Sequence, residues 1–254
     1  RGLLNVQYAI KGETIYVIEA NPRASRTVPF VSKSTGVPLA KCAALIMSGR
    51  SIESLGLTAD DRRMDYFCVK EAVMPFGRFP GSDVVLGPEM KSTGEVMGIA
   101  GNFPAAFTKT QLAIDYEPPR GGEVFISVND GDKRNITAIA RSIARLGFSL
   151  VATTGTARAL RASGIECEKV GKIHAGSHTI LDRIASGEIV LMINTPFGSS
   201  TNTDGYEMRA ACVRHGVSYC TTLAGAQALI AGMEAVRETG LDVIALQDLP
   251  QWEG

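Results

Sequence analysis

The second half of the chain alternates short apolar segments with segments of helical periodicity, and this alternation restricts the possible folds more than any other feature. Strand-like apolar segments occupy residues 124–128, 150–153, 168–170, 189–194, 217–221 and 243–246. Helical spacing covers residues 133–146, 157–162, 178–185, 206–215 and 223–239. Short apolar runs bounded in this way are typical of strands buried in a parallel sheet. The pattern predicts a doubly wound parallel α/β sheet, in which ligands bind beyond the carboxyl ends of the strands.

Small polar residues follow the predicted strands at that edge. Lys133 follows the first strand, Thr153 and Thr156 follow the second, and Asn194 ends the fourth. Backbone amides at a helix start, two hydroxyls and a lysine would together hold a phosphate group, and Lys172 could add a second positive charge. On its own a Thr-Thr-Gly-Thr turn is often only a helix cap. The polar neighbours at other strand ends favour a phosphate site, and without a carboxylate pair or a nucleophile–base pair we expect binding without chemistry.

The start of the chain predicts a β-hairpin with polar side chains on one face. The turn at 11–13 folds one strand-like run onto the next, which places Gln7 near Glu19. Because side chains alternate along a strand, Glu19, Asn21 and Arg23 are expected to project to one side. Carboxylate and amide oxygens suit Mg²⁺, and an arginine beside them suits phosphate. Glu19 alone would more often be a solvated strand residue, but the group indicates the metal–triphosphate end of an ATP site.

The remainder of the first half predicts a mixed region that ends in a linker. Residues 3–32 are expected to form the hairpin and a loop. Further along the chain we expect a helix at 39–47, a short helix or turn at 52–57, strands at 66–73 and 94–100, a loop at 75–88 and a helix at 105–113. The Pro- and Gly-rich stretch at 117–122 is the clearest linker. We therefore predict two domains, 1–120 and 121–254.

Composition excludes several classes of function. Lys plus Arg and Asp plus Glu both number 26, so no net charge points to nucleic acid or to a membrane surface. The sequence has no apolar run long enough to span a bilayer and no signal-peptide pattern. The 5 cysteines are scattered and form no C-x-x-C pair, which favours reduced thiols in the cytoplasm over a disulfide framework.

Three long segments, in one order, resemble the large subunit of the carbamoyl phosphate synthetase family. They are residues 15–33, which begin Ile-Tyr-Val-Ile-Glu-Ala-Asn-Pro-Arg, residues 70–76 (Lys-Glu-Ala-Val-Met-Pro-Phe) and residues 86–98. The resemblance covers nearly the whole chain and implies the C-terminal part of an ATP-grasp domain followed by a methylglyoxal-synthase-like allosteric domain. It implies ATP as a substrate and Mg²⁺ or Mn²⁺ as cofactor. Gln7 and Glu19 would bind ATP and metal, Asn21 would be a further metal ligand, and Arg23 would be catalytic.

The same resemblance implies a reaction and partners. Carbamoyl phosphate would be made from bicarbonate, ATP and ammonia released from glutamine, for pyrimidine and arginine biosynthesis. A glutaminase small subunit would be the protein partner, in an oligomer of heterodimers. The chain opens on Arg1 without an initiator Met, and the glycine-rich lid of an ATP-grasp enzyme is not in the sequence. We therefore expect the C-terminal part of a longer polypeptide that is inactive by itself.

In the second half the resemblance implies two effector sites. A nucleotide such as UMP or IMP would place its phosphate on Lys133, Thr153, Thr156 and Lys172, with Asn194 nearby. Pro196 replaces a hydroxyl residue that some members of the family have, which changes the expected effector preference. Ornithine would bind between the domains, on residues matching Glu71, Tyr219 and Thr221.

Three alternatives compete with this interpretation: another ATP-grasp ligase, a methylglyoxal synthase and a purely structural module. A true methylglyoxal synthase uses an aspartate in a Gly-Gly-Asp turn and a histidine in a Pro-His-Asp loop. Here the corresponding residues are His-Ala-Gly-Ser at 174–177 and Ser-Ser-Thr-Asn-Thr-Asp at 199–204, so both catalytic groups are replaced. A purely structural module would require the threonine–lysine cluster to be incidental.

Overall fold

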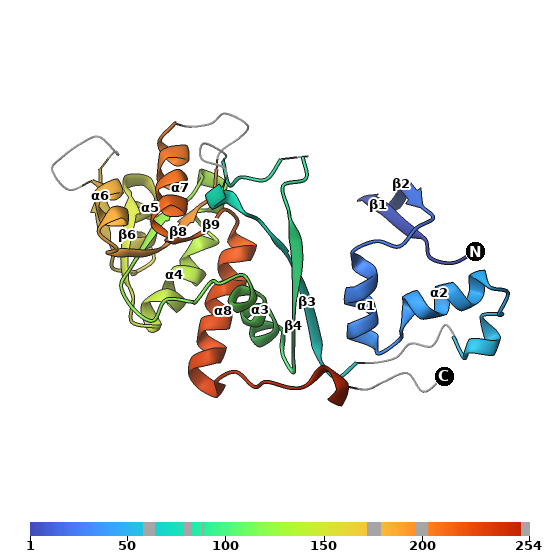
Figure 1. The fold of residues 1–254 in the computed structure, drawn as a ribbon. Helices are drawn as coiled ribbons and strands as arrows, with labels where there is room; N and C mark the ends of the chain where they lie inside the picture. Colours follow the sequence, from blue (N-terminus) through green and yellow to red (C-terminus); the bar gives the residue numbers. More distant parts are fainter. Residues whose placement is uncertain (58–63, 79–82, 88, 172–178, 197–202, 250–254) are drawn as a thin grey trace.

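The computed structural model describes residues 1–57, 64–78, 83–87, 89–171, 179–196 and 203–249. The antiparallel pair β3 (Phe67–Val73) and β4 (Gly94–Ala100) runs through the middle of the molecule (Figure 1). The N-terminal hairpin and two helices lie on one side of this pair, and a parallel sheet with its helices lies on the other (Figure 1). Both predicted central strands, 66–73 and 94–100, are confirmed within a residue.

The parallel sheet confirms the predicted doubly wound fold. Its strand order is β7-β6-β5-β8-β9, and all four neighbouring pairs are parallel. The chain therefore runs from the centre to one edge and then crosses back to build the other edge. The strands are β5 (Glu123–Ser127), β6 (Ser149–Thr153), β7 (Glu168–Val170), β8 (Ile189–Asn194) and β9 (Ser218–Cys220).

Helices cover both faces of this sheet because its strand residues alternate between two apolar clusters. Val124 and Ile126 of β5 pack with one cluster, and Phe125 packs with the other. The first cluster takes in α4 (Ile136–Arg145), α5 (Thr154–Ala162) and α8 (Leu223–Thr239). The second takes in α6 (Ile180–Ala185) and α7 (Thr203–His215).

Several predicted boundaries were wrong. Helix α5 begins at Thr154 and not at 157, so the Thr-Thr-Gly-Thr turn forms its first turn. Helix α4 begins at Ile136 and not at 133, after a short 3-10 turn over Asp130–Asp132. The predicted strand at 243–246 is not a strand: α8 ends at Thr239, its C-cap residue Gly240 has φ 71°, and Val243 beyond it is 98% exposed. Among the described residues no strand pairs with this segment, so local β-propensity alone misled the prediction.

The predicted loop over residues 22–32 was also wrong. Helix α1 (Thr27–Thr35) begins there, and α2 (Leu39–Met47) follows as predicted. Pro29 lies in the first turn of α1, where the missing amide would have no partner within the helix. The proline and its β-branched neighbours therefore argued against a helix in the sequence, although a proline in the first turn is compatible with one.

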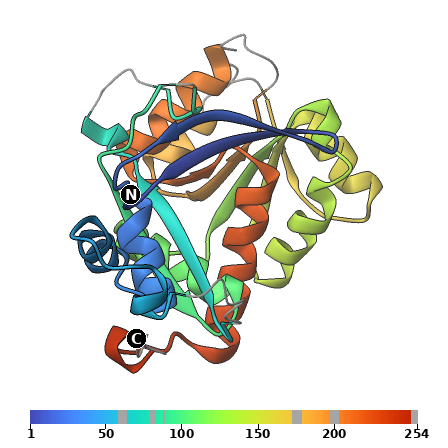
Figure 2. The ribbon, with the colours of Figure 1, turned by 90° about the vertical axis from the view of Figure 1, so that its right-hand side faces the viewer.

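The N-terminal hairpin pairs as predicted. β1 (Asn5–Lys11) and β2 (Thr14–Asn21) are antiparallel, with Gln7 opposite Glu19. Figure 2 shows the hairpin extending beyond α1 and α2, and nearly all of its residues are exposed.

Helix α3 (Phe103–Ala113) joins the central strand pair to the parallel-sheet half. It packs on β3 and β4 on one side and on α8 on the other. Both contacts depend on glycines: a Cβ on Gly98 of β4 would lie 2.0 Å from the Ala106 carbonyl oxygen, and one on Gly232 of α8 would lie 2.2 Å from Thr108 Oγ1. The predicted linker is held in the same region, where Arg237 of α8 donates to the Arg120 carbonyl at 2.8 Å. Helix α3, on the near side of the predicted domain boundary, thus packs against α8 on the far side.

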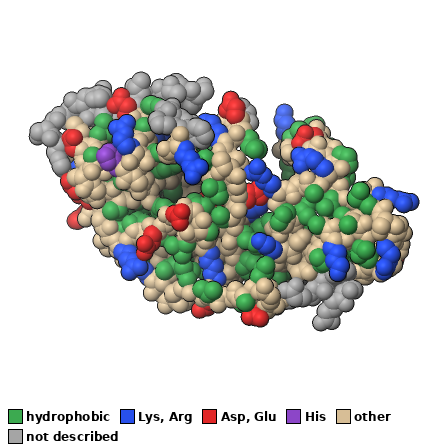
Figure 3. Space-filling view, viewed as in Figure 1, with side chains coloured by type: hydrophobic (Ala, Val, Ile, Leu, Met, Phe, Trp, Pro, Cys, Tyr) green, Lys and Arg blue, Asp and Glu red, His purple; other side chains and the backbone are tan. Residues whose placement is uncertain are grey.

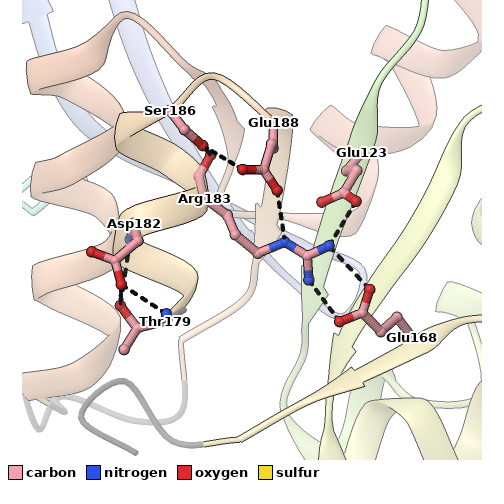
Figure 4. Close-up of polar contacts among 7 residues, drawn as sticks. All are labelled: Glu123, Glu168, Thr179, Asp182, Arg183, Ser186 and Glu188. Carbon is pink, nitrogen blue, oxygen red and sulfur yellow. Dashed lines mark hydrogen bonds and ion pairs between the residues drawn. The ribbon is translucent and has the colours of Figure 1, made fainter. Parts of the chain in front are cut away.

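Helix α6 is fixed to the amino end of the sheet by one buried arginine (Figure 4). Arg183 is 7% exposed and contacts Glu123 at 2.6 Å, Glu168 at 2.8 Å and Glu188 at 3.4 Å. Hydrogen bonding to Glu168 outweighs the effect of burial, so the pKa of Arg183 is raised and its charge is retained. Three carboxylates around one guanidinium thus add a polar attachment to the apolar packing of Ile180 and Ile184.

We expect Gly98→Ala to destabilise the protein by about 1–3 kcal/mol, because the added methyl group would meet backbone that cannot move aside cheaply. Urea unfolding of the chain measures the change. Gly101→Ala is the matched control, since a Cβ there meets no atom within 4 Å. Equal stability of the two variants would show that the α3–β4 contact is not as close as described.

Replacing Arg183 by Met should destabilise folding by about 1–3 kcal/mol, because Glu123, whose side chain is 23% exposed, is left without its cation while Glu168 and Glu188 stay solvated. Arg145→Met is the control: its pair with Glu234 at 3.5 Å involves a side chain that is 66% exposed, and such pairs contribute at most about 1 kcal/mol. Thermal and urea unfolding of both variants provide the comparison. A loss at Arg183 no larger than that at Arg145 would contradict this role.

Candidate functional site

A cavity of 360 Å³ opens at the carboxyl ends of the central strands. This is the edge at which the sequence predicts a ligand. Ser127, Thr153 and Asn194 come from the ends of β5, β6 and β8, and Ile180 comes from α6. The remaining lining residues include Thr154 and Gly155 from the start of α5, and Asp204, Gly205 and Met208 from α7.

The first turn of α5 presents backbone amides at this cavity. Thr153 is its N-cap residue, with extended φ and ψ angles, but its side chain does not cap the helix. Its hydroxyl lies 3.3 Å from Thr156 Oγ1 and 3.4 Å from Ser127 Oγ. Amides at a helix start, together with the positive end of the helix dipole, attract an anion. Sequence reasoning missed Ser127, although it ends the first strand on the same edge.

Thr156 and Lys133 lie beside the cavity and do not line it. Thr156 is buried, and its Oγ1 accepts from the Val128 amide at 3.2 Å. The Lys133 ammonium lies over Gly155, where a Cβ would be 2.9 Å from Nζ, and it pairs with Asp130. This hydrogen bond lowers the pKa of Asp130. Lys172, His174 and His178 lie outside the described residues.

Asn194 is held by a network that the sequence did not predict. Its Nδ2 donates to the Ser127 carbonyl at 3.2 Å, and its Oδ1 accepts from Arg209 Nη1 at 2.8 Å. Arg209 also donates to both carboxylate oxygens of Asp83, at 2.8 and 2.6 Å. Burial would raise the pKa of Asp83, but hydrogen bonds from Arg209 and from the Val85 amide hold it below its usual value. Asp83 therefore stays ionised at neutral pH.

A second cavity, of 560 Å³, brings together the three residues expected for an amine effector. Glu71 of β3, Tyr219 of β9 and Thr221 all line it. Glu71 accepts hydrogen bonds from Thr110 at 2.6 Å and from Gln111 at 2.5 Å, both on α3. Burial raises the pKa of Tyr219 to about 12, so it remains a neutral phenol. The cavity thus offers two carboxylates, those of Glu71 and Asp115, together with neutral hydroxyl groups.

At the N-terminal hairpin, two of the predicted metal ligands contact each other. Asn21 Nδ2 donates to Glu19 Oε1 at 2.9 Å, and Gln7 is the cross-strand partner of Glu19. The expectation for Arg23 was wrong in one respect: β2 ends at Asn21, and the Arg23 amide turns back to the Asn21 carbonyl, so strand alternation does not reach it. Among the described residues no three His, Cys, Asp or Glu side chains could share a metal. Asn21 turns its amide nitrogen, and not its oxygen, toward Glu19, so its oxygen would have to rotate inward to join the carboxylate in a hard donor set of the kind that Mg²⁺ takes.

On the face in Figure 3, basic and acidic side chains are interspersed with hydrophobic ones. Within the part of the chain that the structure describes, no helix has the length and apolar character needed to cross a bilayer.

Both halves of the chain match known protein families. Residues 1–55 match the family "Carbamoyl-phosphate synthase L chain, ATP binding domain", and residues 135–221 match the "MGS-like domain" family. The carbamoyl phosphate synthase large chain of Myxococcus xanthus is 49% identical over 247 residues, covering 97% of this chain and 23% of that protein. The C-terminal section of the large chain from Methanopyrus kandleri is 51% identical over 255 residues, covering 98% of this chain and 47% of that protein.

The fold is therefore the end of an ATP-grasp domain followed by a methylglyoxal-synthase-like domain. The chain belongs to the family of carbamoyl phosphate synthase large chains and corresponds to their C-terminal portion. It spans about a quarter of the length of full large chains, 23% of the one from Myxococcus xanthus. A solved methylglyoxal synthase from Elizabethkingia anophelis is 18% identical, with a TM-score of 0.37 over 44% of this chain and 78% of that one, a likeness too distant to bear on function.

Proposed function

We propose that the chain contributes part of one ATP site and the regulatory domain of a carbamoyl phosphate synthetase. In the whole enzyme, bicarbonate is phosphorylated, ammonia displaces the phosphate to give carbamate, and carbamate is phosphorylated in turn. The segment belongs to the second phosphorylation site, and a glutaminase small subunit supplies the ammonia. The family matches at both ends of the chain support this assignment.

The hairpin holds the metal end of the ATP site in this proposal. Glu19 and Asn21 adjoin one another, and Gln7 faces Glu19 across the strand pair. These side chains would bind Mg²⁺ or Mn²⁺, which when bound supplies positive charge against the transferred phosphoryl group. Arg23 is exposed just beyond the strand and would contact a phosphate oxygen. The hairpin alone supplies few of the contacts that a nucleotide needs. In this proposal the 254-residue chain by itself is therefore inactive.

Residues 121–254 form the regulatory domain in this proposal, and the cavity at the start of α5 is its nucleotide site. The observation that carries this assignment is the convergence of uncapped helix amides, the Thr153 hydroxyl and the Lys133 ammonium at one end of the sheet. A nucleotide monophosphate such as UMP or IMP would place its dianionic phosphate there. Thr156 would fix the position of the loop after β5 and would not contact the ligand through its hydroxyl, because its Oγ1 already accepts a hydrogen bond from the Val128 amide. Pro196 offers no hydroxyl to the ligand.

The second cavity would bind ornithine. Glu71 is fixed by two hydrogen bonds from α3 and would pair with the amine of the ligand, while Tyr219 and Thr221 would supply hydroxyl contacts. The cavity is lined by β3, α3 and β9, so a ligand there would touch both the ATP-grasp half and the regulatory half.

Lys133→Ala should weaken nucleotide binding by about tenfold to a hundredfold, since a charge-assisted hydrogen bond contributes roughly 1.5–3 kcal/mol. Calorimetry with UMP and with IMP measures this on the 254-residue chain. Arg145→Ala removes the same charge from an exposed position on another part of the domain and should change little. No binding to the wild type, or equal loss in both variants, would rule out the site. Conversion of dihydroxyacetone phosphate to methylglyoxal would support the synthase alternative instead.

Glu19→Gln in the full-length large chain should abolish carbamate phosphorylation and spare bicarbonate-dependent ATP hydrolysis, because Glu19 belongs to the second site only. The two partial reactions are assayed separately. Glu13→Gln, an exposed carboxylate in the turn of the same hairpin, is the control and should affect neither. Equal loss of both reactions, or loss of neither, would contradict the assignment.

A further inference from the structure

One buried guanidinium joins the two cavities described above. Arg209 is 5% exposed, and its three nitrogens are all engaged, two with Asp83 and one with Asn194. A bidentate contact between an arginine and a carboxylate fixes both the distance and the relative orientation of the two side chains. A buried arginine is stable only while its charge is compensated by these partners. A shift of Asn194 or of Asp83 would therefore weaken the contact of Arg209 with the other partner as well.

The two partners of Arg209 lead to different cavities. Asn194 lines the 360 Å³ cavity at the start of α5. Asp83 is followed directly by Val84, which is 4% exposed and lines the 560 Å³ cavity with Glu71 and Tyr219. Helix α7 itself reaches from one cavity to the other, because Met208 lines the first cavity and Cys212 lines the second.

Gly205, one turn before Arg209 on α7, leaves room for the guanidinium. A Cβ at this position would lie 2.9 Å from Arg209 Nη1 and 3.6 Å from Asn194 Oδ1. An alanine would therefore displace the guanidinium without removing any charge. The position of α7 that faces the contact between Arg209 and Asn194 is thus a glycine, which has no side chain to crowd that contact.

We propose that Arg209 is a positioning residue that couples occupancy of the nucleotide cavity to occupancy of the amine cavity through Asp83 and Asn194. The proposal rests on the function proposed for these two cavities. Coupling between sites is reciprocal, so each ligand must change the affinity of the other by the same factor. A continuous hydrogen-bonded chain with partners on both sides is a physical route for such coupling.

The test is calorimetry of UMP and IMP with and without saturating ornithine, and of ornithine with and without nucleotide. In the wild type we expect each ligand to change the dissociation constant of the other by about fivefold or more. Arg209→Lys keeps the charge but cannot bridge both partners, and Gly205→Ala displaces the bridge. Each should reduce the factor to below about twofold, whereas Arg145→Lys, in an exposed pair, should leave it unchanged.

A ligand-free measurement separates this proposal from the one it rests on. Asp83→Asn should shift the side-chain amide resonance of Asn194 in the free protein, because Arg209 would lose its charged partner. Should that resonance stay in place, the bridge does not exist, whatever binds. Should both ligands bind the wild type without mutual effect, or with an effect that Arg209→Lys and Gly205→Ala leave intact, the coupling role is overturned while the two sites stand. Absence of binding to either cavity would instead remove the proposed function and the coupling with it.

Discussion

The close approach of α3 to β4 and to α8 is the contact on which the rest of the arrangement depends. Gly98 lets the α3 backbone approach β4, and Gly232 lets the Thr108 side chain of α3 approach α8, to distances that an added methyl group would block. Packing this tight resists small displacements, because neighbouring atoms have no free volume to move into. The central strand pair and the parallel sheet are therefore held as one packed body, although the linker between them is rich in Pro and Gly.

That contact also shapes the 560 Å³ cavity that is proposed to bind an amine. Thr110 and Gln111 of α3 hold Glu71 of β3, while Tyr219 reaches the same space from β9. Under the proposed function, a ligand in this cavity would contact both halves of the chain and so respond to their relative position. The cavity proposed for the nucleotide lies within the parallel-sheet half. Arg209 links it to Asp83, which comes from the segment between β3 and β4.

Sequence patterns predicted the features that arise from local periodicity. The five strands of the sheet, the hairpin register of Gln7 and Glu19, and the polar strand ends all follow from alternation and position. The patterns failed where the decisive partner is distant. Arg209 and Asp83 are 126 positions apart, and the carboxylates around Arg183 come from three different segments. Pro29 and the apolar run at 243–246 misled because the first turn of a helix tolerates proline and because a strand needs a neighbour.

The central claim is that a nucleotide phosphate binds at the start of α5. The most direct measurement is a titration of the isotopically labelled chain with UMP and with IMP, followed through its backbone amide resonances. The account predicts that the largest shifts occur at Thr154, Gly155 and Thr156, whose amides would donate to the phosphate. Absence of shifts at saturating nucleotide, or shifts confined to the opposite end of the sheet around Glu123 and Ser149, would contradict it.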